Sequence, residues 1–242
     1  MKPGEIRLIS LERKVTEKND LLAAGIRERL GQAQVLALNL LSGPGAGKTS
    51  LLERTLPLLL PDYRCLVVEG DLLTPNDAQR ISRLGVPAVQ IETRGACHLD
   101  SRMVDSALSG VDLDALDLLF IENVGNLVCP TGFDLGEAVR VVVSSTTEGA
   151  DKPAKYPYIF DRAAAVVLNK IDLLPYVPFE VESFARGVRE INTNAPLFPL
   201  SCTSGEGLTE WCQWIRQQAE PVCGRGGASS KKAPAAPAPQ GA

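Results

Sequence analysis

The sequence has no long apolar run and no excess of basic residues. No stretch approaches about 18 consecutive apolar residues, so we expect no membrane span. The stretch from Met1 to Arg7 lacks an apolar run with a small-residue cleavage site, so we expect no secretory signal. Lys and Arg number 25 against 29 Asp and Glu, which gives a net charge of −4, and no basic stripe stands out. A nucleic-acid partner is therefore not expected.

Histidine is almost absent, and cysteine is scattered. His98 is the only histidine, and the six cysteines do not cluster as they do in small disulfide scaffolds. In a chain without an export signal we expect reduced thiols, some filling the core and some binding a ligand. We interpret Cys65, Cys202 and Cys212 as core residues within strands or helix faces, and Cys223 as an inert residue of the tail.

Short apolar strands alternate with helical stretches along most of the chain. Its 242 residues, 45% of them hydrophobic, allow a core of useful size. The alternation predicts an α/β fold in which a mainly parallel sheet is flanked by helices on both faces and binds ligands at the carboxyl ends of its strands. We expect strands at 35–41, 64–69, 88–91, 117–121, 138–143, 164–168 and 197–200, and helices at 15–30, 48–59, 75–84, 100–108, 179–191 and 208–217.

Composition divides the chain into three parts. Residues 1–30 form a helical extension ahead of the first strand, and residues 31–220 form the α/β domain. Residues 221–242 are rich in Gly, Ala and Pro, a composition typical of a disordered tail.

A glycine-rich turn follows the first strand and opens the next helix, which is the context of a P-loop. The sequence runs Ser42-Gly43-Pro44-Gly45-Ala46-Gly47-Lys48-Thr49-Ser50. Glycines let main-chain N–H groups curl around phosphate oxygens, Lys48 supplies a point charge for the β- and γ-phosphates, and the Thr49 hydroxyl is a Mg²⁺ ligand. Ser42 stands where the usual motif has glycine. The alternative is a strand–helix turn without a ligand, but the flanking elements favour a P-loop NTPase.

Asn169-Lys170-Ile171-Asp172 comes directly after a strand, late in the domain. A carboxylate there accepts hydrogen bonds from guanine N1–H and the 2-amino group, donors that adenine lacks at those positions, and an unpaired buried acceptor is costly. The pattern therefore predicts selection of GTP and GDP. Ser201 and Cys202 follow the next strand and are candidates to back the base through their main chain; a plain turn is an equal alternative.

Two carboxylates stand at strand ends on the nucleotide side. Asp71 and Glu122, with Lys48, are the candidates for catalysis, and the two acids with Thr49 are the candidates to hold Mg²⁺. Gly125 can offer its N–H to the γ-phosphate. Solvated strand-end acids are the alternative. No glutamine is evident for positioning water, so we expect slow hydrolysis, or hydrolysis completed by a second subunit or a partner.

Cys97-His98 and Cys129 lie on two loops expected at the nucleotide face. The expected helix start near Cys97 predicts a lowered thiol pKa there. Thiolate and imidazole suit Zn²⁺ and Ni²⁺. Three ligands leave a site open, or shared across a symmetric dimer. Cys129 follows Glu122 by seven residues, so nucleotide state can change the metal geometry. Two buried thiols and a surface histidine are an equal alternative on spacing alone.

These motifs together resemble the HypB family, the nickel-incorporation GTPases of nickel–iron hydrogenase maturation. The resemblance covers roughly residues 8 to 218. Its strings are Glu12-Arg13-Lys14-Val15 with Asn19-Asp20, the P-loop, Glu69-Gly70-Asp71, Gly95-Ala96-Cys97-His98-Leu99-Asp100, Glu122-Asn123-Val124-Gly125-Asn126-Leu127-Val128-Cys129-Pro130, Glu148 to Pro157, and Asn169 to Asp172.

The resemblance implies a cytoplasmic metallochaperone of the class that includes UreG and the signal-recognition GTPases. It implies a GTP-dependent homodimer that binds Ni²⁺ or Zn²⁺ at the subunit interface through Cys97, His98 and Cys129. It also implies a HypA-type accessory protein and the hydrogenase large-subunit precursor as partners.

Two features depart from the family pattern. Residues 1 to 30 contain no Cys and no His, so we do not expect the high-affinity nickel motif that many members carry there. The Ala/Pro-rich tail also falls outside the pattern.

Two other functions stay open: a related GTPase serving urease or a cobalamin enzyme, and a P-loop small-molecule kinase. The predicted guanine selector, Asn169 to Asp172, argues against the kinase, since such kinases do not usually select guanine.

Overall fold

The computed structural model describes residues 12–71, 76–93 and 95–224. Seven strands form one sheet in the order β3-β2-β4-β1-β5-β6-β7, and every neighbouring pair is parallel. The predicted α/β fold is therefore confirmed. The strands are β1 (Leu36–Ser42), β2 (Cys65–Asp71), β3 (Ala88–Glu92), β4 (Leu118–Glu122), β5 (Val139–Ser145), β6 (Ala165–Asn169) and β7 (Leu197–Pro199). The α-helices are α1 (Glu12–Gln32), α2 (Lys48–Leu59), α3 (Asn76–Ser82), α4 (Ser101–Leu108), α5 (Lys152–Lys155), α6 (Pro157–Asp161), α7 (Val181–Ile191) and α8 (Leu208–Cys223).

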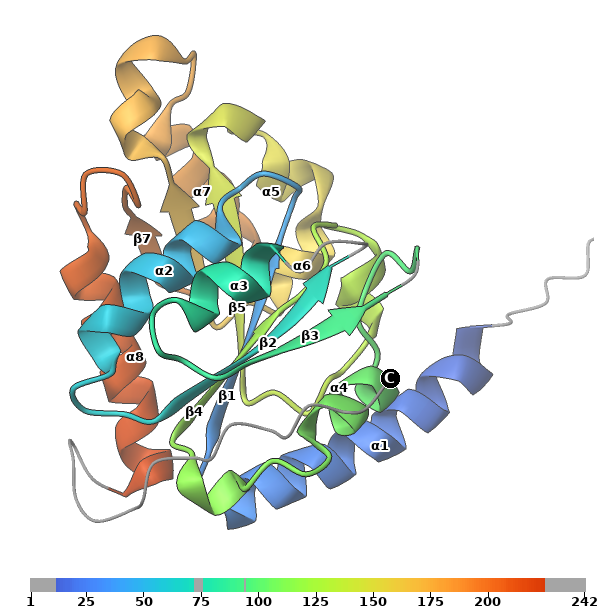
Figure 1. Cartoon of the computed structure of the whole chain (residues 1–242). Helices are drawn as coiled ribbons and strands as arrows, with labels where there is room; N and C mark the ends of the chain where they lie inside the picture. The colour runs from blue at the N-terminus through green and yellow to red at the C-terminus, as the bar shows by residue number, and fades with distance from the viewer. Residues whose placement is uncertain (1–11, 72–75, 94, 225–242) are drawn as a thin grey trace, which may run out of the picture.

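Helices cover both faces of the sheet (Figure 1). Alternate residues of a strand point to opposite faces, so β1 sends Leu36, Leu38 and Leu40 into the core beneath α2, α3 and α8. Its Ala37 faces the other way, into a second core with α1 and α4. A third core lies beneath α6 and α7. Because the crossovers put helices on both faces, the described residues of the five inner strands are almost all buried, as their apolar runs predicted, whereas the edge strands β3 and β7 are only partly buried.

The helix boundaries differ from expectation mainly at the two ends. The first helix begins at Glu12 instead of Val15, and α8 continues to Cys223 instead of ending at Gln217. Pro221–Cys223, expected in the tail, are therefore helical, and Gly224 ends the helix in the left-handed conformation, with φ 67°. The rest of the predicted tail lies outside the described residues. The division into three parts at 30/31 and 220/221 stays a prediction.

Cys223 is not the inert tail residue that we expected. It is half-buried, packs against the core beneath α8, and its Sγ lies 3.4 Å from the carbonyl oxygen of Asp117. The apolar stripe of α8 runs on through Ala219 and Val222, which explains why the helix continues. The short helices α5 and α6 were not predicted from the sequence; each has a proline in its first turn, where a missing N–H costs nothing.

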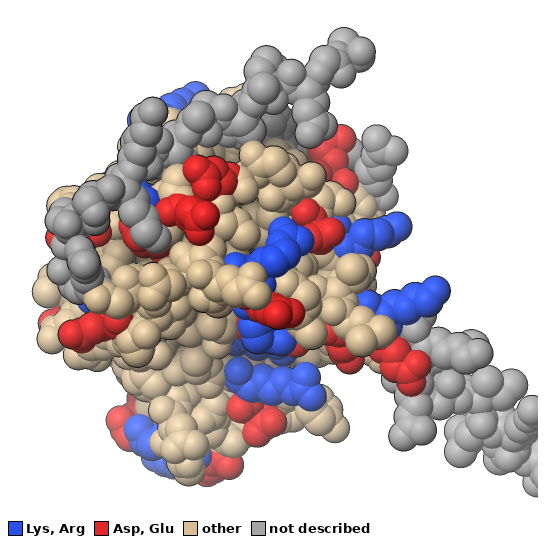
Figure 2. Space-filling view, turned by 90° about the horizontal axis from the view of Figure 1, so that it is seen from below, with Lys and Arg blue, Asp and Glu red and all other residues tan. Residues whose placement is uncertain are grey.

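In the part of the chain that the structure describes, no helix is long and apolar enough to cross a membrane. The face seen from below carries acidic and basic side chains interspersed (Figure 2). No single sign of charge dominates that face.

Candidate functional site

The P-loop leaves β1 at the carboxyl end of the sheet and enters α2. Gly45 and Gly47 have φ of 76° and 99°, a conformation that favours glycine. A Cβ on Gly47 would lie 2.5 Å from Nδ2 of Asn169, and a Cβ on Gly43 would lie 2.3 Å from Oε1 of Glu148. The glycines therefore allow the close approach of two other loops as well as an unusual backbone.

Lys48 and Thr49 begin α2 and point at one carboxylate. The Thr49 hydroxyl donates to Oε1 of Glu122 at 2.9 Å, and Nζ of Lys48 lies 4.0 Å from the same oxygen. Nζ also donates to Oγ of Ser42 at 2.8 Å, so the irregular P-loop position holds the lysine in this structure. Lys48, Thr49 and Glu122 are each more than nine-tenths buried. The structure thus brings together the predicted residues Lys48, Thr49 and Glu122.

Glu69 lies directly across from Glu122 in the pairing of β2 with β4, and our sequence analysis did not select it as a site residue. Its exposed fraction is 1%, and that of Glu122 is 6%. Burial, the charge of Glu122 and a hydrogen bond to it raise the pKa of Glu69 to about 10. Burial also raises the pKa of Glu122, against the opposing effects of Lys48 and Thr49. Burial therefore opposes the ionised form of both carboxyl groups.

The acid pair fits a hard divalent cation. Oε1 of Glu69 and Oε2 of Glu122 are buried and have no hydrogen-bond partner among the described residues. Mg²⁺ prefers such oxygen ligands, one or two from carboxylates with the rest from water and phosphate. Thr49 adds a hydroxyl to the same cluster. Asp71 ends β2 close by, but only its main chain is described, so its predicted roles in catalysis and Mg²⁺ binding stay predictions.

A groove of about 500 Å³ runs along the P-loop, and a second loop closes on it. A Cβ on Gly125 would lie 2.9 Å from Cα of Pro44, so the loop after β4 packs directly on the P-loop. Arg80 of α3 also reaches the groove and donates to Oγ of Ser50 at 3.2 Å. The groove is lined by Pro44, Gly45, Gly47, Lys48, Thr49, Ser50, Gly70, Asp77, Arg80, Glu122, Asn123, Val124, Gly125 and Lys170.

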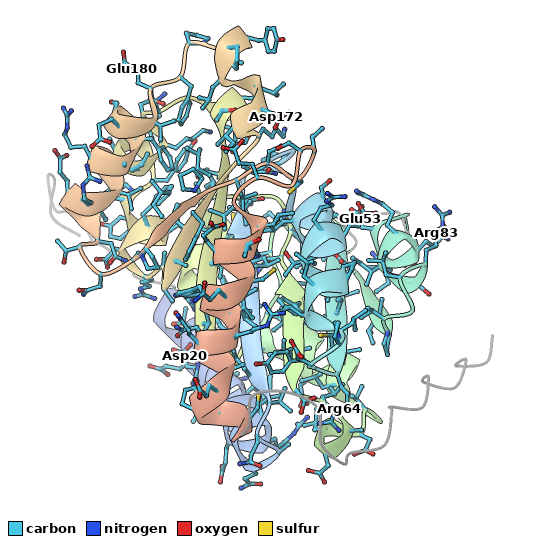
Figure 3. All side chains as sticks on the ribbon, turned by 90° about the vertical axis from the view of Figure 1, so that its left-hand side faces the viewer. Asp20, Glu53, Arg64, Arg83, Asp172 and Glu180 are labelled. Carbon is cyan, nitrogen blue, oxygen red and sulfur yellow. The ribbon has the colours of Figure 1, made fainter. Side chains whose placement is uncertain are left out.

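The predicted base selector lies beside the P-loop. Asn169 donates from Nδ2 to the carbonyl oxygen of Ala46 at 2.9 Å, and Lys170 donates from Nζ to that of Gly45 at 2.7 Å. Asp172 lies towards the end of the molecule opposite Arg64, the residue that directly precedes β2 (Figure 3). The bonds from Asn169 and Lys170 tie the base-selecting loop to the phosphate-binding loop.

The Ser201 side chain contacts the predicted base selector, and the predicted support of the base by the main chain of Ser201 and Cys202 stays a prediction. Its Oγ donates to Oδ1 of Asp172 at 2.5 Å and accepts the N–H groups of Thr203 and Ser204. The main-chain N–H of Cys202 donates to Oδ1 of Asn169 at 3.3 Å. Cys202 lies in the turn after β7, not within a strand or helix as we expected. Burial raises the pKa of its thiol to about 11.

The two cysteine loops meet. Ligand atoms of Cys97, His98 and Cys129 all lie within 4.8 Å of one another. Sγ of Cys97 lies 3.5 Å from Nδ1 of His98, and the His98 ring packs on Phe133 with centroids 3.9 Å apart. Burial lowers the pKa of His98, which favours the neutral imidazole that binds metals. The donor set suits a soft or borderline cation such as Ni²⁺ or Zn²⁺.

The predicted lowering of the Cys97 thiol pKa is wrong. Helix α4 begins only at Ser101, because Asp100 caps it by accepting the N–H of Met103 at 2.8 Å. Cys97 therefore precedes the helix, beyond the reach of its dipole. A hydrogen bond with Cys129 raises the pKa of Cys97.

The fold and these loops define a P-loop nucleotide-binding protein. The family model described as "CobW/HypB/UreG, nucleotide-binding domain" matches residues 37–199. The chain belongs to this family, and within it to the HypB hydrogenase maturation factors, as its motifs predicted.

Several relatives carry that name. The chain is 48% identical over 212 residues to the hydrogenase maturation factor HypB of Escherichia coli K12, covering 88% of this chain and 73% of that protein. It is 50% identical over 218 residues to HypB of Azotobacter vinelandii, covering 89% of this chain and 72% of that one. The crystal structure of HypB from Helicobacter pylori in complex with nickel has 37% identity and a TM-score of 0.80, covering 84% of this chain and 96% of that one.

Proposed function

We propose that this protein is a GTP-hydrolysing nickel chaperone that helps to insert nickel into the large subunit of nickel–iron hydrogenase. One observation carries the proposal. The loop that begins at Glu122, beside Lys48 and Thr49, ends at Cys129, beside Cys97 and His98. One short segment therefore joins a phosphate-sensing carboxylate to a metal ligand.

The nucleotide side supports binding and hydrolysis of GTP. Lys48 and the P-loop amides would hold the phosphates, with Thr49, Glu122 and Asp71 around Mg²⁺. When bound, Mg²⁺ would neutralise charge on the phosphates as the γ-phosphoryl group leaves. Asp172, held by Ser201, would accept hydrogen bonds from guanine, while Asn169, Lys170 and Cys202 fix the loops around the base. We expect slow turnover, because no glutamine among the described residues is evident as the one that positions the attacking water.

The metal side supports binding of a nickel or zinc cation. Cys97, His98 and Cys129 provide three donors, and a further ligand must come from water or a second subunit. A GTP-dependent homodimer that completes the site across its interface satisfies this need. The nickel-bound relative from Helicobacter pylori supports nickel as the cargo. A HypA-type accessory protein and the hydrogenase precursor, in the cytoplasm, are the partners we propose.

Delivery to urease is a second candidate. The relative in Helicobacter hepaticus, 41% identical over 214 residues and covering 87% of this chain and 88% of that one, is named a hydrogenase/urease maturation factor. The same nucleotide and metal chemistry serves both acceptors. The acceptor protein distinguishes the two functions.

The test combines nucleotide and metal measurements on the full chain. Phosphate release should be faster from GTP than from ATP and should require Mg²⁺. Ni²⁺ titration should give stoichiometric binding to the dimer that Cys129→Ala abolishes. Cys223→Ala, a half-buried thiol at the far end of α8, is the matched control and should bind as the wild type does. Equal hydrolysis of ATP, or unchanged Ni²⁺ binding by Cys129→Ala, would contradict the proposal.

A further inference from the structure

Asn19, in the middle of α1, bonds to both loops that carry the candidate metal ligands. Its Nδ2 donates to the carbonyl oxygen of Asp134 at 2.7 Å, five residues after Cys129. Its Oδ1 accepts the main-chain N–H of Ser101 at 2.8 Å, three residues after His98. Its exposed fraction is only 6%, so both bonds are shielded from water. One amide therefore spans two segments that lie far apart in the sequence.

The rest of α1 holds the segment after Cys129 in the same place. Arg27 donates to Oδ1 of Asp134 at 2.6 Å. Gly136 has φ 84°, and a Cβ there would lie 2.7 Å from Cβ of Ile26, so α1 packs directly on the backbone. Figure 1 shows α1 lying along α4, the helix that follows the Cys97-His98 loop. The helix is thus fixed against both ligand-bearing segments.

Metal binding needs this kind of support. Ligand atoms must be held within about 0.5 Å of the coordinating geometry, and loops achieve that only when other groups fix them. Asp134 adjoins Phe133, whose ring packs on His98. The bond from Asn19 to Asp134 therefore fixes one ligand loop and also the aromatic surface on which the imidazole of the other loop rests.

We propose that Asn19 is a positioning residue for the metal site, holding the Cys97-His98 loop and the Cys129 loop at the spacing that a cation requires. The inference rests on the proposed metal-binding function and deepens it. The family match begins at residue 37, so α1 lies outside the matched nucleotide-binding domain. On this account, α1 turns two loops of that domain into a metal site.

A merely structural role for Asn19 predicts a different outcome. In that case, replacing it lowers the melting temperature and leaves the metal affinity of the folded protein unchanged. The readouts are therefore the Ni²⁺ affinity, measured by competition with a chromophoric chelator, and the thiolate-to-nickel charge-transfer absorption. GTP affinity and the melting temperature are recorded for each variant.

Three variants separate the two bonds. Asn19→Ala removes both bonds, and Asn19→Asp keeps the acceptor for Ser101 but loses the donor to Asp134. Ser101→Ala is the matched control, because it removes only the 2.9 Å bond from the serine hydroxyl to the Asn19 carbonyl oxygen and leaves the side-chain bridge intact. If Asn19→Ala does not fold, Asn19→Asp provides the test.

We expect both Asn19 variants to bind Ni²⁺ about tenfold more weakly, the size of loss typical of residues that support metal ligands, with an altered charge-transfer band. Ser101→Ala should bind as the wild type does, and GTP affinity should be unchanged in all three. Wild-type Ni²⁺ affinity and spectrum in folded Asn19→Asp would overturn the inference. A wild-type protein that binds no Ni²⁺ through Cys97, His98 and Cys129 would instead overturn the proposed function.

Discussion

The side chain of Asn123 accepts a hydrogen bond of 3.1 Å from the main-chain N–H of Leu99. Asn123 directly follows the carboxylate Glu122, and Leu99 directly follows the candidate ligand His98. Both residues are buried. We infer from this bond that a shift of Glu122 on nucleotide exchange would be passed to the second cysteine loop as well as along its own loop to Cys129.

Asn123→Ala should uncouple the two sites. Removing the acceptor leaves the Leu99 N–H unpaired in a buried place, which costs about 1–3 kcal/mol of stability. The variant should still bind Ni²⁺, but its Ni²⁺ affinity should become nearly the same in the GDP and GTP-analogue states. Asn192→Ala, which removes bonds to the Phe160 and Ala163 carbonyl oxygens, should lower stability without changing the coupling. Full coupling in Asn123→Ala would rule out this route.

Asp172→Asn should weaken GTP binding by at least about a hundredfold, because a site built to accept two guanine donors is left with a mismatched amide. The same variant should prefer xanthosine triphosphate, whose base presents an oxygen where guanine has its amino group. Ser201→Ala frees the carboxylate from its 2.5 Å partner and should cost less. Competition binding assays measure the nucleotide affinities of the wild type, Asp172→Asn and Ser201→Ala. Unchanged GTP affinity in Asp172→Asn would refute the assignment of the base selector.

Glu69→Gln should stabilise the nucleotide-free protein at pH 7. The pKa of Glu69, raised to about 10, means that the folded protein keeps a proton that the unfolded chain releases above its ordinary pKa, so stability falls as pH rises towards 10. Glutamine removes that cost, and we expect a gain of about 1–3 kcal/mol in urea unfolding.

Glu137→Gln is the matched control for that experiment. Glu137 is also buried, but it accepts hydrogen bonds from Arg140 at 2.5 Å and from the Leu135 N–H at 2.7 Å. Its replacement should destabilise the protein, because it leaves the largely shielded guanidinium of Arg140 without its charge partner. The same sign of change in both variants would show that Glu69 is an ordinary buried acid.

Asp134→Asn should reduce stability in a pH-dependent way. Burial alone would raise the pKa of Asp134, but its bonds with Arg27 and with the Gly136 N–H outweigh burial and lower it. A lowered pKa contributes stability above the ordinary value near 3.8, and this stability is lost as pH falls through the folded-state value. Urea midpoints of wild type and variant should therefore differ at pH 7 and converge below about pH 4. A difference that is constant with pH would contradict the ion pair's contribution.

Contiguous motifs predicted most of the residues that the structure brings together along the P-loop. The P-loop and the segment from Asn169 to Asp172 each hold their geometry within a few residues, so their sequence alone indicates where they lie. The position of Ser201 followed from a strand end, but the role of its side chain did not, since that depends on the turn through Thr203 and Ser204 that orients its hydroxyl.

Residues that act across the fold were missed. Glu69 becomes a site residue only because the register of β2 with β4 places it opposite Glu122, and no local signal gives that register. Asn19 is one polar residue on a helix, and its two bonds come from tertiary packing. The helix α4 was predicted to within one residue, and the error was to place Cys97 at its start: Asp100, a good N-cap, was the available signal that Cys97 lies before the helix.

The central claim is that nucleotide state controls the metal site, and Ni²⁺ titration in two nucleotide states tests it most directly. The wild-type protein is titrated with Ni²⁺ in saturating GDP with Mg²⁺, and again in a non-hydrolysable GTP analogue. We predict Ni²⁺ affinities that differ by at least about fivefold, and a reciprocal change of the same size in the affinity for the analogue when Ni²⁺ is bound. Equal Ni²⁺ affinity in the two states would contradict the account and leave a GTPase with an uncoupled metal site.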